Sequence, residues 1–290
     1  MSDPKDPRQE HPSTYMVQDR SSTEEMMRLQ MQDQLLNTSM GGVLAEQANP
    51  THFRRVLDVG CGAGGWLIET AQTYPDISVL IGVDISSKML GFARAQAALQ
   101  QVGNRLEFLS MDALRMLEFP NAFFDLVNQR LGASYLRTWD WPKLLQEYQR
   151  VVRPGGIIRI TESDWITGNS DSPALAQLSE LALQAHFHAG HLAHPVANGV
   201  TSALPDLCQQ HGIQHVQTRP SLLTFHAGTT AGLLFVEDVA RLFRNIKPFL
   251  QKWTSLPDDY DEIYQQMLNE MNNPNFVGNM KLLTVWGTRA

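Results

Sequence analysis

Apolar residues gather in short β-branched runs that are separated by helical patterns and by turns rich in glycine or proline. Val56–Val59 and Val79–Asp84 have the length and composition of buried strands. Strands that alternate with helical segments are typical of a doubly wound sheet. The pattern therefore predicts an α/β fold.

A helix is predicted before the first strand. Ser22-Thr-Glu-Glu25 has the form of a capping box, and the apolar pattern after it extends to about Asn37. Its apolar residues are Met26, Met27, Leu29, Met31, Leu35 and Leu36. They occupy too many sides for a free surface helix, so we expect it to pack on the main domain or to cover a bound ligand. Residues 1–20 are polar, and we expect them to dock loosely.

The second half of the chain predicts two helices and two strands. Ser172-Pro173 opens a helix to about Ala189, because proline suits the first helical position. A helix over Ala203–His211 and a strand near His215–Phe225 follow, and a final strand lies near Lys281–Thr288.

Residues 227–273 separate those last two strands and carry aromatic residues on segments broken by Pro248 and Pro257. We interpret them as a helical cap over a substrate, with plain packing or a dimer surface as alternatives. The expected division is a lid at 1–40, a core at 41–226, the cap at 227–273 and the final strand at 274–290.

Composition narrows the class of protein. At 290 residues, the chain is long enough for one large α/β domain with an appendage. No apolar run approaches the roughly 18 residues of a membrane span. The N-terminal segment lacks the apolar core of a secretory signal, and two cysteines, Cys61 and Cys208, give no disulfide framework. We therefore expect a cytoplasmic protein that does not insert into a membrane.

The charge distribution argues against nucleic-acid binding. The formal net charge is −7, and the 23 basic residues are scattered along the chain. Binding to phosphates requires clustered lysine and arginine side chains. A small-molecule partner is therefore expected.

The turn after the first strand carries the main chemical signal. It reads Asp58-x-Gly60-x-Gly62-x-Gly64, and Asp84 ends the next strand. Glycines let bare backbone approach a ligand, and an acid at the tip of the next strand can accept hydrogen bonds from ribose hydroxyls. The turn differs from the Gly-x-Gly-x-x-Gly fingerprint that binds the pyrophosphate of a dinucleotide. These features predict a nucleoside site.

This turn resembles motif I of the class I S-adenosylmethionine-dependent methyltransferases. Further matches lie at Phe119–Arg130 and Leu145–Gly156, and the resemblance is specific over about 54–164. It implies a Rossmann-like, doubly wound, seven-stranded sheet that is mostly parallel with an antiparallel last strand. It also implies S-adenosylmethionine as the cofactor.

The resemblance assigns cofactor contacts residue by residue. Asp58, Gly60 and Gly62 would face the methionine and ribose, Asp84 the ribose diol, and Ile85 the adenine. Asp112 with Ala113 would read the adenine amino group. We also expect contacts from neighbouring positions on the same turn and strand ends, namely Cys61, Gly64, Met111, Asn128 and Arg130.

The leading segment contains Tyr15-Met-Val-Gln-Asp-Arg20, Glu24-Glu25, Arg28-Leu-Gln30 and Gln34-Leu-Leu36. It resembles the N-terminal region of bacterial small-molecule methyltransferases and of fungal methyltransferase-like regulators of secondary metabolism. In those proteins this region closes over the cofactor. Tyr15 and Gln34 are the candidates for that contact here; alternatively, Tyr15 packs on the surface and Gln34 is solvated.

The resemblance implies methyl transfer to a nitrogen, oxygen or carbon atom of a small molecule by in-line displacement. A catalytically silent methyltransferase-like regulator and an NAD-dependent oxidoreductase are the alternatives. Methyl transfer mainly requires collinear reactants in a dry pocket, and a base is needed only where the acceptor must lose a proton.

Candidates for that base lie after the fourth and fifth strands, at Tyr135, Glu162 and Asp164, and in the histidine cluster 186–194, at His188 and His191. The histidine spacing also permits a metal site or a structural role, and no metal site is predicted. A homodimer is possible.

Overall fold

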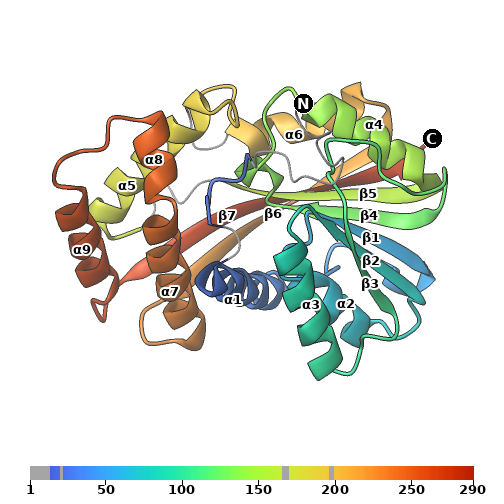
Figure 1. Cartoon of the computed structure of the whole chain (residues 1–290), viewed down its shortest axis with the longest axis horizontal. Helices are drawn as coiled ribbons and strands as arrows, with labels where there is room; N and C mark the ends of the chain where they lie inside the picture. The colour runs from blue at the N-terminus through green and yellow to red at the C-terminus, as the bar shows by residue number, and fades with distance from the viewer. Residues whose placement is uncertain (1–13, 20–21, 165–169, 196–198) are drawn as a thin grey trace, which may run out of the picture.

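The computed structural model describes residues 14–19, 22–164, 170–195 and 199–290, and it shows one seven-stranded sheet (Figure 1). The strands are β1 (Arg55–Val59), β2 (Val79–Asp84), β3 (Leu106–Ser110), β4 (Phe124–Arg130), β5 (Val152–Asp164), β6 (Ile213–His226) and β7 (Val277–Arg289). Their order is β3-β2-β1-β4-β5-β7-β6. Strands β1 to β5 pair in parallel, and β7 is antiparallel to both neighbours. The predicted sheet is therefore confirmed.

Helices cover both faces of the sheet. They are α1 (Thr23–Ser39), α2 (Gly65–Thr73), α3 (Ser87–Leu99), α4 (Trp141–Val151), α5 (Pro173–His188), α6 (Gly199–Gln210), α7 (Thr230–Asn245), α8 (Lys247–Trp253) and α9 (Tyr260–Met271), with short 3-10 turns at Pro50–His52 and Gly132–Ser134. In Figure 1, α1, α2 and α3 lie on one face, and α4 and α6 lie on the other. None of these helices is long and apolar enough to cross a membrane.

Strands β6 and β7 are much longer than β1, with 14 and 13 residues against five. Their far ends carry α5, α7, α8 and α9, which lie together on the left of Figure 1. A separate apolar core joins these helices to both strands; within it Phe225 and Phe235 stack with their ring centroids 4.6 Å apart. The segment 227–273 is helical, as predicted, and α5 shares its core. The domain boundaries remain a prediction.

Helix α1 begins as the capping box predicts. The Ser22 hydroxyl accepts a hydrogen bond from the Glu25 N–H, and the helix ends two residues later than expected. Leu35 and Leu36 are buried in the same core as α7, while Met27 is exposed. The helix therefore packs between the sheet domain and the cap, which confirms that it is not a free surface helix.

Candidate active site

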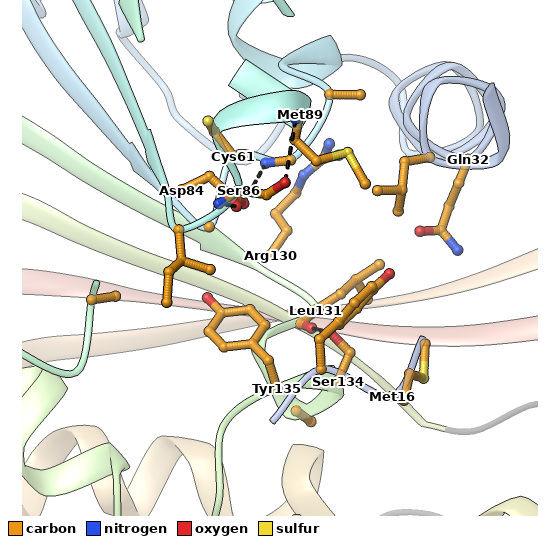
Figure 2. A pocket seen from close by; sticks show the side chains of 18 of the residues that line it. Met16, Gln32, Cys61, Asp84, Ser86, Met89, Arg130, Leu131, Ser134 and Tyr135 are labelled. Carbon is orange, nitrogen blue, oxygen red and sulfur yellow. Dashed lines mark hydrogen bonds between the residues drawn. The ribbon is translucent and has the colours of Figure 1, made fainter. Parts of the chain in front are cut away.

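One cavity, of about 280 Å³, opens at the carboxyl ends of the parallel strands (Figure 2). The residues that follow β1, β2, β3 and β4 form one side, and Glu162 near the end of β5 joins them. The other side comes from residues 14–16, α1, α7 and Met280 of β7. Carboxyl ends of parallel strands are the usual place for ligands in such sheets.

The glycine turn leaves no space for a side chain at its start. Gly60 has φ +68°, and a Cβ added there would lie 2.5 Å from the Tyr135 hydroxyl oxygen. Gly64, with φ +78°, forms the N-cap of α2, and a Cβ there would lie 2.9 Å from Phe108 and Ala93. Both positions combine left-handed backbone with close packing, so glycine is required.

Asp84 ties the glycine turn to the end of β2. Its Oδ2 accepts a hydrogen bond of 3.1 Å from the Gly62 N–H, and its Oδ1 accepts one of 2.8 Å from the Ser86 N–H. The carboxylate lines the cavity. Two backbone N–H groups therefore fix the orientation of the Asp84 carboxylate.

Asp58 is buried in β1 and has the polar partner that its apolar strand predicts. Asn128 of β4 donates a hydrogen bond of 2.7 Å to Asp58 Oδ1 and accepts one of 2.6 Å from Arg159. Burial raises the pKa of Asp58 to about 7, although the charge of Arg130 and the bond from Asn128 oppose this shift. Asn128 thus supports the site from behind and does not line the cavity.

Arg130 lines the cavity and joins α1 to the strand ends. Its guanidinium forms an ion pair with Asp33 and donates a hydrogen bond of 2.8 Å to Asn37 Oδ1. The Gly65 N–H at the start of α2 also donates to Asp33, while burial raises the pKa of that carboxyl. Helix α2 has no side-chain cap of its own. Asp33 of α1 therefore provides the hydrogen-bond acceptor for the Gly65 N–H at the N-terminus of α2.

Glu162 holds the turn that follows β4. Its carboxyl accepts hydrogen bonds from the N–H groups of Gly132, at 2.7 Å, and Ala133, at 3.2 Å, and from the Gln129 side-chain amide. Burial raises the pKa of Glu162 to about 8 despite these three donors. The group is therefore mainly protonated at neutral pH, which does not suit a general base.

The Tyr135 side chain, carried by that turn, lines the cavity and lies below Asp84 in Figure 2. Its hydroxyl is buried and has no hydrogen-bond partner among the described residues. Burial and the nearby Glu162 raise the pKa of Tyr135 well above its usual value. A neutral phenol in this position is available to donate a hydrogen bond to a ligand.

The raised pKa of Glu162 predicts a pH dependence of stability. Between about pH 4.5 and pH 8 the folded state keeps a proton that the unfolded chain releases. Stability from this group therefore falls as pH rises through that window, by at most about 1.4 kcal/mol per pH unit. Glu162→Gln should flatten the decline in free energy of unfolding, measured with urea at pH 5.5 and pH 8. The exposed Glu107→Gln is the control, and equal declines in wild type and Glu162→Gln would contradict the prediction.

Most of the residues predicted for the site line this cavity, and five do not. Those that line it are Tyr15, Asp58, Gly60, Cys61, Gly62, Asp84, Ile85, Met111, Asp112, Ala113, Arg130, Tyr135 and Glu162. Gln34 is exposed on α1, because the cavity face of that helix carries Gln32 and Asp33 instead. Gly64 packs behind the turn, and Asn128 lies behind Asp58.

The histidine cluster lies away from the cavity. His188 is exposed and contacts the Trp253 carbonyl through Nδ1 at 2.8 Å. His191 is buried against His186 and Phe249, and burial lowers its pKa to about 4. His188 and His191 are therefore the fourth and fifth predicted residues outside the cavity lining, and His191 lies against the backbone of Ala133 and Leu136. Neither side chain lines this cavity. The structure does not describe residues 1–13, Trp165 or the side chain of Asp164.

Among the residues that the structure describes, no group of His, Cys, Asp and Glu is arranged to hold a metal ion.

Sequence reasoning missed the residues that α1 and α7 contribute. These include Arg28, Leu29, Gln32, Asp33, Asp238 and Leu242. The α1 positions pair at a spacing of four, 28 with 32 and 29 with 33, which places them on one helical face. That spacing shows that these residues share a face, but nothing in the sequence marked this face, or Asp238, as part of a site.

A family model described as a methyltransferase domain matches residues 56–156, which contain the glycine turn, Asp84 and Asp112. Residues 56–156 form a methyltransferase domain. The match ends at residue 156, before the cap, and α1 and α7 lie outside it. The methyltransferase domain therefore supplies the strand-end side of the cavity.

Proteins with a similar sequence or a similar fold include named methyltransferases. A demethylmenaquinone methyltransferase of Deinococcus radiodurans is 38% identical over 109 residues, which cover 38% of this chain and 43% of that protein. The chain thus spans less than half the length of this curated relative. Among solved structures, YcgJ of Bacillus subtilis has a TM-score of 0.54 at 20% identity, covering 87% of this chain and 99% of that one. Phosphoethanolamine N-methyltransferase 2 of Haemonchus contortus, in complex with phosphomonomethylethanolamine and S-adenosylhomocysteine, has a TM-score of 0.57 at 17% identity over 95% of this chain and 60% of that one. These structures share the fold of the methyltransferase domain.

Proposed function

We propose that the protein transfers the methyl group of S-adenosylmethionine to a nitrogen, oxygen or carbon atom of a small molecule. The observation that carries the proposal is the position of the cavity: the glycine turn, Asp84 and Asp112 of the methyltransferase domain all line it. The D. radiodurans relative, whose name states methyl transfer to a small molecule, supports the same reaction class.

The side chains present fit the proposed cofactor. Gly60 and Gly62 expose backbone, Asp84 offers an oriented carboxylate, and the buried Tyr135 hydroxyl lacks a partner among the described residues. Asp84 would hold ribose hydroxyls, and Asp112 would read the adenine. Bound S-adenosylmethionine would supply the methyl group, which an acceptor takes by in-line displacement.

The remaining residues would act by orienting the acceptor and excluding water. Tyr15, Met16 and Leu242 close the cavity on the side away from the glycine turn, and Leu29 covers Gly62 of that turn. A dry site favours the loss of charge at a sulfonium. Glu162 would act as a positioning residue that holds the turn carrying Tyr135. We also propose that the protein acts in secondary metabolism, because its leading segment resembles proteins of that kind. We propose a cytoplasmic location and a homodimer, with no nucleic-acid partner.

A catalytically silent regulator and an NAD-dependent oxidoreductase make different predictions. Calorimetry should show micromolar or tighter binding of S-adenosylmethionine and S-adenosylhomocysteine, and no binding of NAD. Release of S-adenosylhomocysteine with labelled methyl groups in an acceptor should then identify the enzyme. Cofactor binding with no turnover across a broad acceptor panel favours the regulator, and binding of NAD alone refutes the proposal.

A further inference from the structure

The side of the cavity away from the glycine turn has its own chemistry. We name it the acceptor wall and define it by the lining residues Met16, Arg28, Gln32, Leu131, Asp238, Leu242 and Met280. Figure 2 draws Met16 and Gln32 apart from Asp84 and Cys61, with Tyr135 beside Leu131 and Ser134. Four of its seven residues are apolar. Methionine side chains adapt to irregular ligands.

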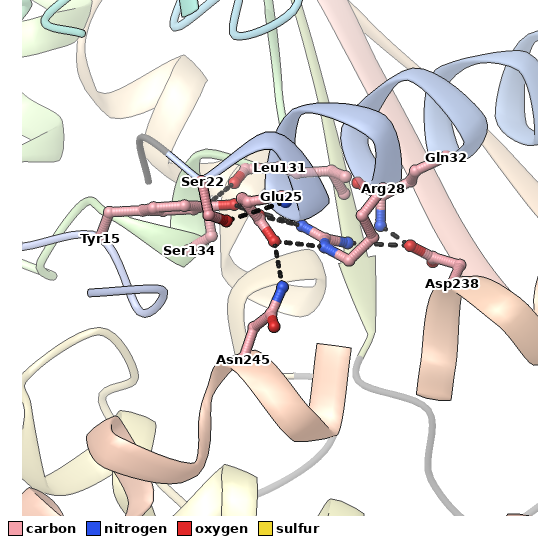
Figure 3. A network of polar contacts seen from close by, with 9 residues as sticks. All are labelled: Tyr15, Ser22, Glu25, Arg28, Gln32, Leu131, Ser134, Asp238 and Asn245. Atoms are coloured by element: carbon pink, nitrogen blue, oxygen red, sulfur yellow. Dashed lines mark hydrogen bonds and ion pairs between the residues drawn. The ribbon is translucent and has the colours of Figure 1, made fainter. Parts of the chain in front are cut away.

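Arg28 is the only cation of the acceptor wall, and its charge is already matched by neighbours (Figure 3). Its Nε donates to Glu25 Oε2 at 2.9 Å, and its Nη2 donates to Glu25 Oε1 at 2.7 Å. Its Nη1 donates to Asp238 Oδ1 at 2.9 Å, and Nη2 also contacts the Tyr15 hydroxyl. The guanidinium is 1% exposed. Four of its five N–H donors are thus used within the protein.

The carboxylates around Arg28 are held by further donors. Asn245 donates to Glu25 Oε2 at 2.9 Å, and Gln32 donates to Asp238 Oδ2 at 3.2 Å. One guanidinium between two carboxylates leaves the network with no spare positive charge. The pKa of Glu25 is lowered, because Arg28 and the hydrogen bonds outweigh its burial.

The rest of the cavity offers no other free cation among the residues described. The second basic residue of the lining, Arg130, is paired with Asp33. The carboxyl residues of the lining outnumber the two basic ones even without Glu162, which is mainly protonated at neutral pH; they are Asp33, Asp58, Asp84, Asp112, Glu162 and Asp238. An anion that enters this cavity would lose its water without gaining an unmatched positive side chain among the described residues.

We infer that the methyl acceptor carries no phosphate, diphosphate or carboxylate group and is a neutral or cationic, largely apolar molecule. The inference rests on the proposed function. It separates this cavity from a site such as that of the H. contortus enzyme, whose bound ligand is a phosphomonoester. The pairing of Arg28 with Glu25 and Asp238 is the feature that excludes anions.

The test measures anion binding to protein saturated with S-adenosylhomocysteine, so that only the acceptor wall is open. Inorganic diphosphate and phosphoethanolamine are the probes, and calorimetry at low salt is the readout. We expect no binding of either probe to the wild type at millimolar concentration. Asp238→Asn removes one of the two carboxylate charges on Arg28 and should strengthen diphosphate binding at least about tenfold.

A second variant makes the same change in charge by another route. Gln32→Lys adds a cation beside Asp238 at a half-buried position, and it should also acquire diphosphate binding. Glu237→Gln is the matched control: it removes a carboxylate from the neighbouring α7 residue, which pairs with Arg241 outside the cavity. It should remain without diphosphate binding.

Two results would overturn the inference. One is binding of either anionic probe to the saturated wild type. The other is failure of every folded charge variant to bind diphosphate, since the Arg28 network would then not be what excludes anions. Failure of the wild type to bind S-adenosylhomocysteine is a separate result, which counts against the proposed function.

Discussion

Arg28→Met should lower the free energy of unfolding by about 3 to 5 kcal/mol. The substitution keeps a long side chain but leaves the buried carboxylates of Glu25 and Asp238 without their cation. Urea denaturation followed by circular dichroism measures the loss. Because Asp238 lies on α7, the contact between α1 and the cap should open first, and amide exchange in α1 should speed up.

Arg244→Met is the matched control for Arg28→Met. Arg244 also joins α7 to α1, through Glu24, but its side chain is 59% exposed. An exposed pair contributes about 0 to 1 kcal/mol. Similar losses in both variants would show that the burial of Arg28 is not what makes its network important.

Asp84→Ala should weaken the binding of S-adenosylhomocysteine at least about tenfold. The carboxylate would accept two charge-assisted hydrogen bonds from the ribose, each worth about 1.5 to 3 kcal/mol, and about 1.4 kcal/mol corresponds to tenfold in affinity. The variant also frees the N–H groups of Gly62 and Ser86, so the glycine turn loses its acceptor. Calorimetry at fixed pH and salt gives the change in affinity.

Two further variants separate the ligand contact from the support of the turn. Asp84→Asn keeps an acceptor for the backbone but removes the charge, so it should lose less affinity than Asp84→Ala. Asp76→Ala removes an exposed acid from the loop before β2 and should change nothing. Unchanged affinity in Asp84→Ala would remove Asp84 from the site.

Local patterns made the sheet and one side of the cavity predictable. The strand before the glycine turn, the turn itself and Asp84 lie within 29 consecutive residues, 56–84, so their spacing is visible in the sequence. The need of Asp58 for a polar partner also followed from its apolar strand, and Asn128 meets it.

The acceptor wall could not be predicted in the same way. Arg28 and Asp238 are 210 residues apart, and their contact depends on how α1 and α7 pack. The sequence also did not show which face of α1 lies toward the cavity, because apolar residues occur on all sides of that helix. This is why Gln34 was expected at the cavity that Gln32 and Asp33 line. The position of the histidine cluster was hidden for a related reason, since whether His188 and His191 reach the cavity depends on how α5 and the residues after it pack.

The insertion of β7 between β5 and β6 affects the order of folding during synthesis. β7 follows every other strand in the sequence, yet it pairs with β5 from Ile157 to Asp164 and with β6 along nearly its whole length. As the chain leaves the ribosome, the methyltransferase domain can therefore assemble while β6 still has no strand to pair with. Nascent β6 is a long strand with unpaired edges, which is the form most prone to association with other chains. Its exposed polar residues and Pro220 would limit that risk until β7 arrives.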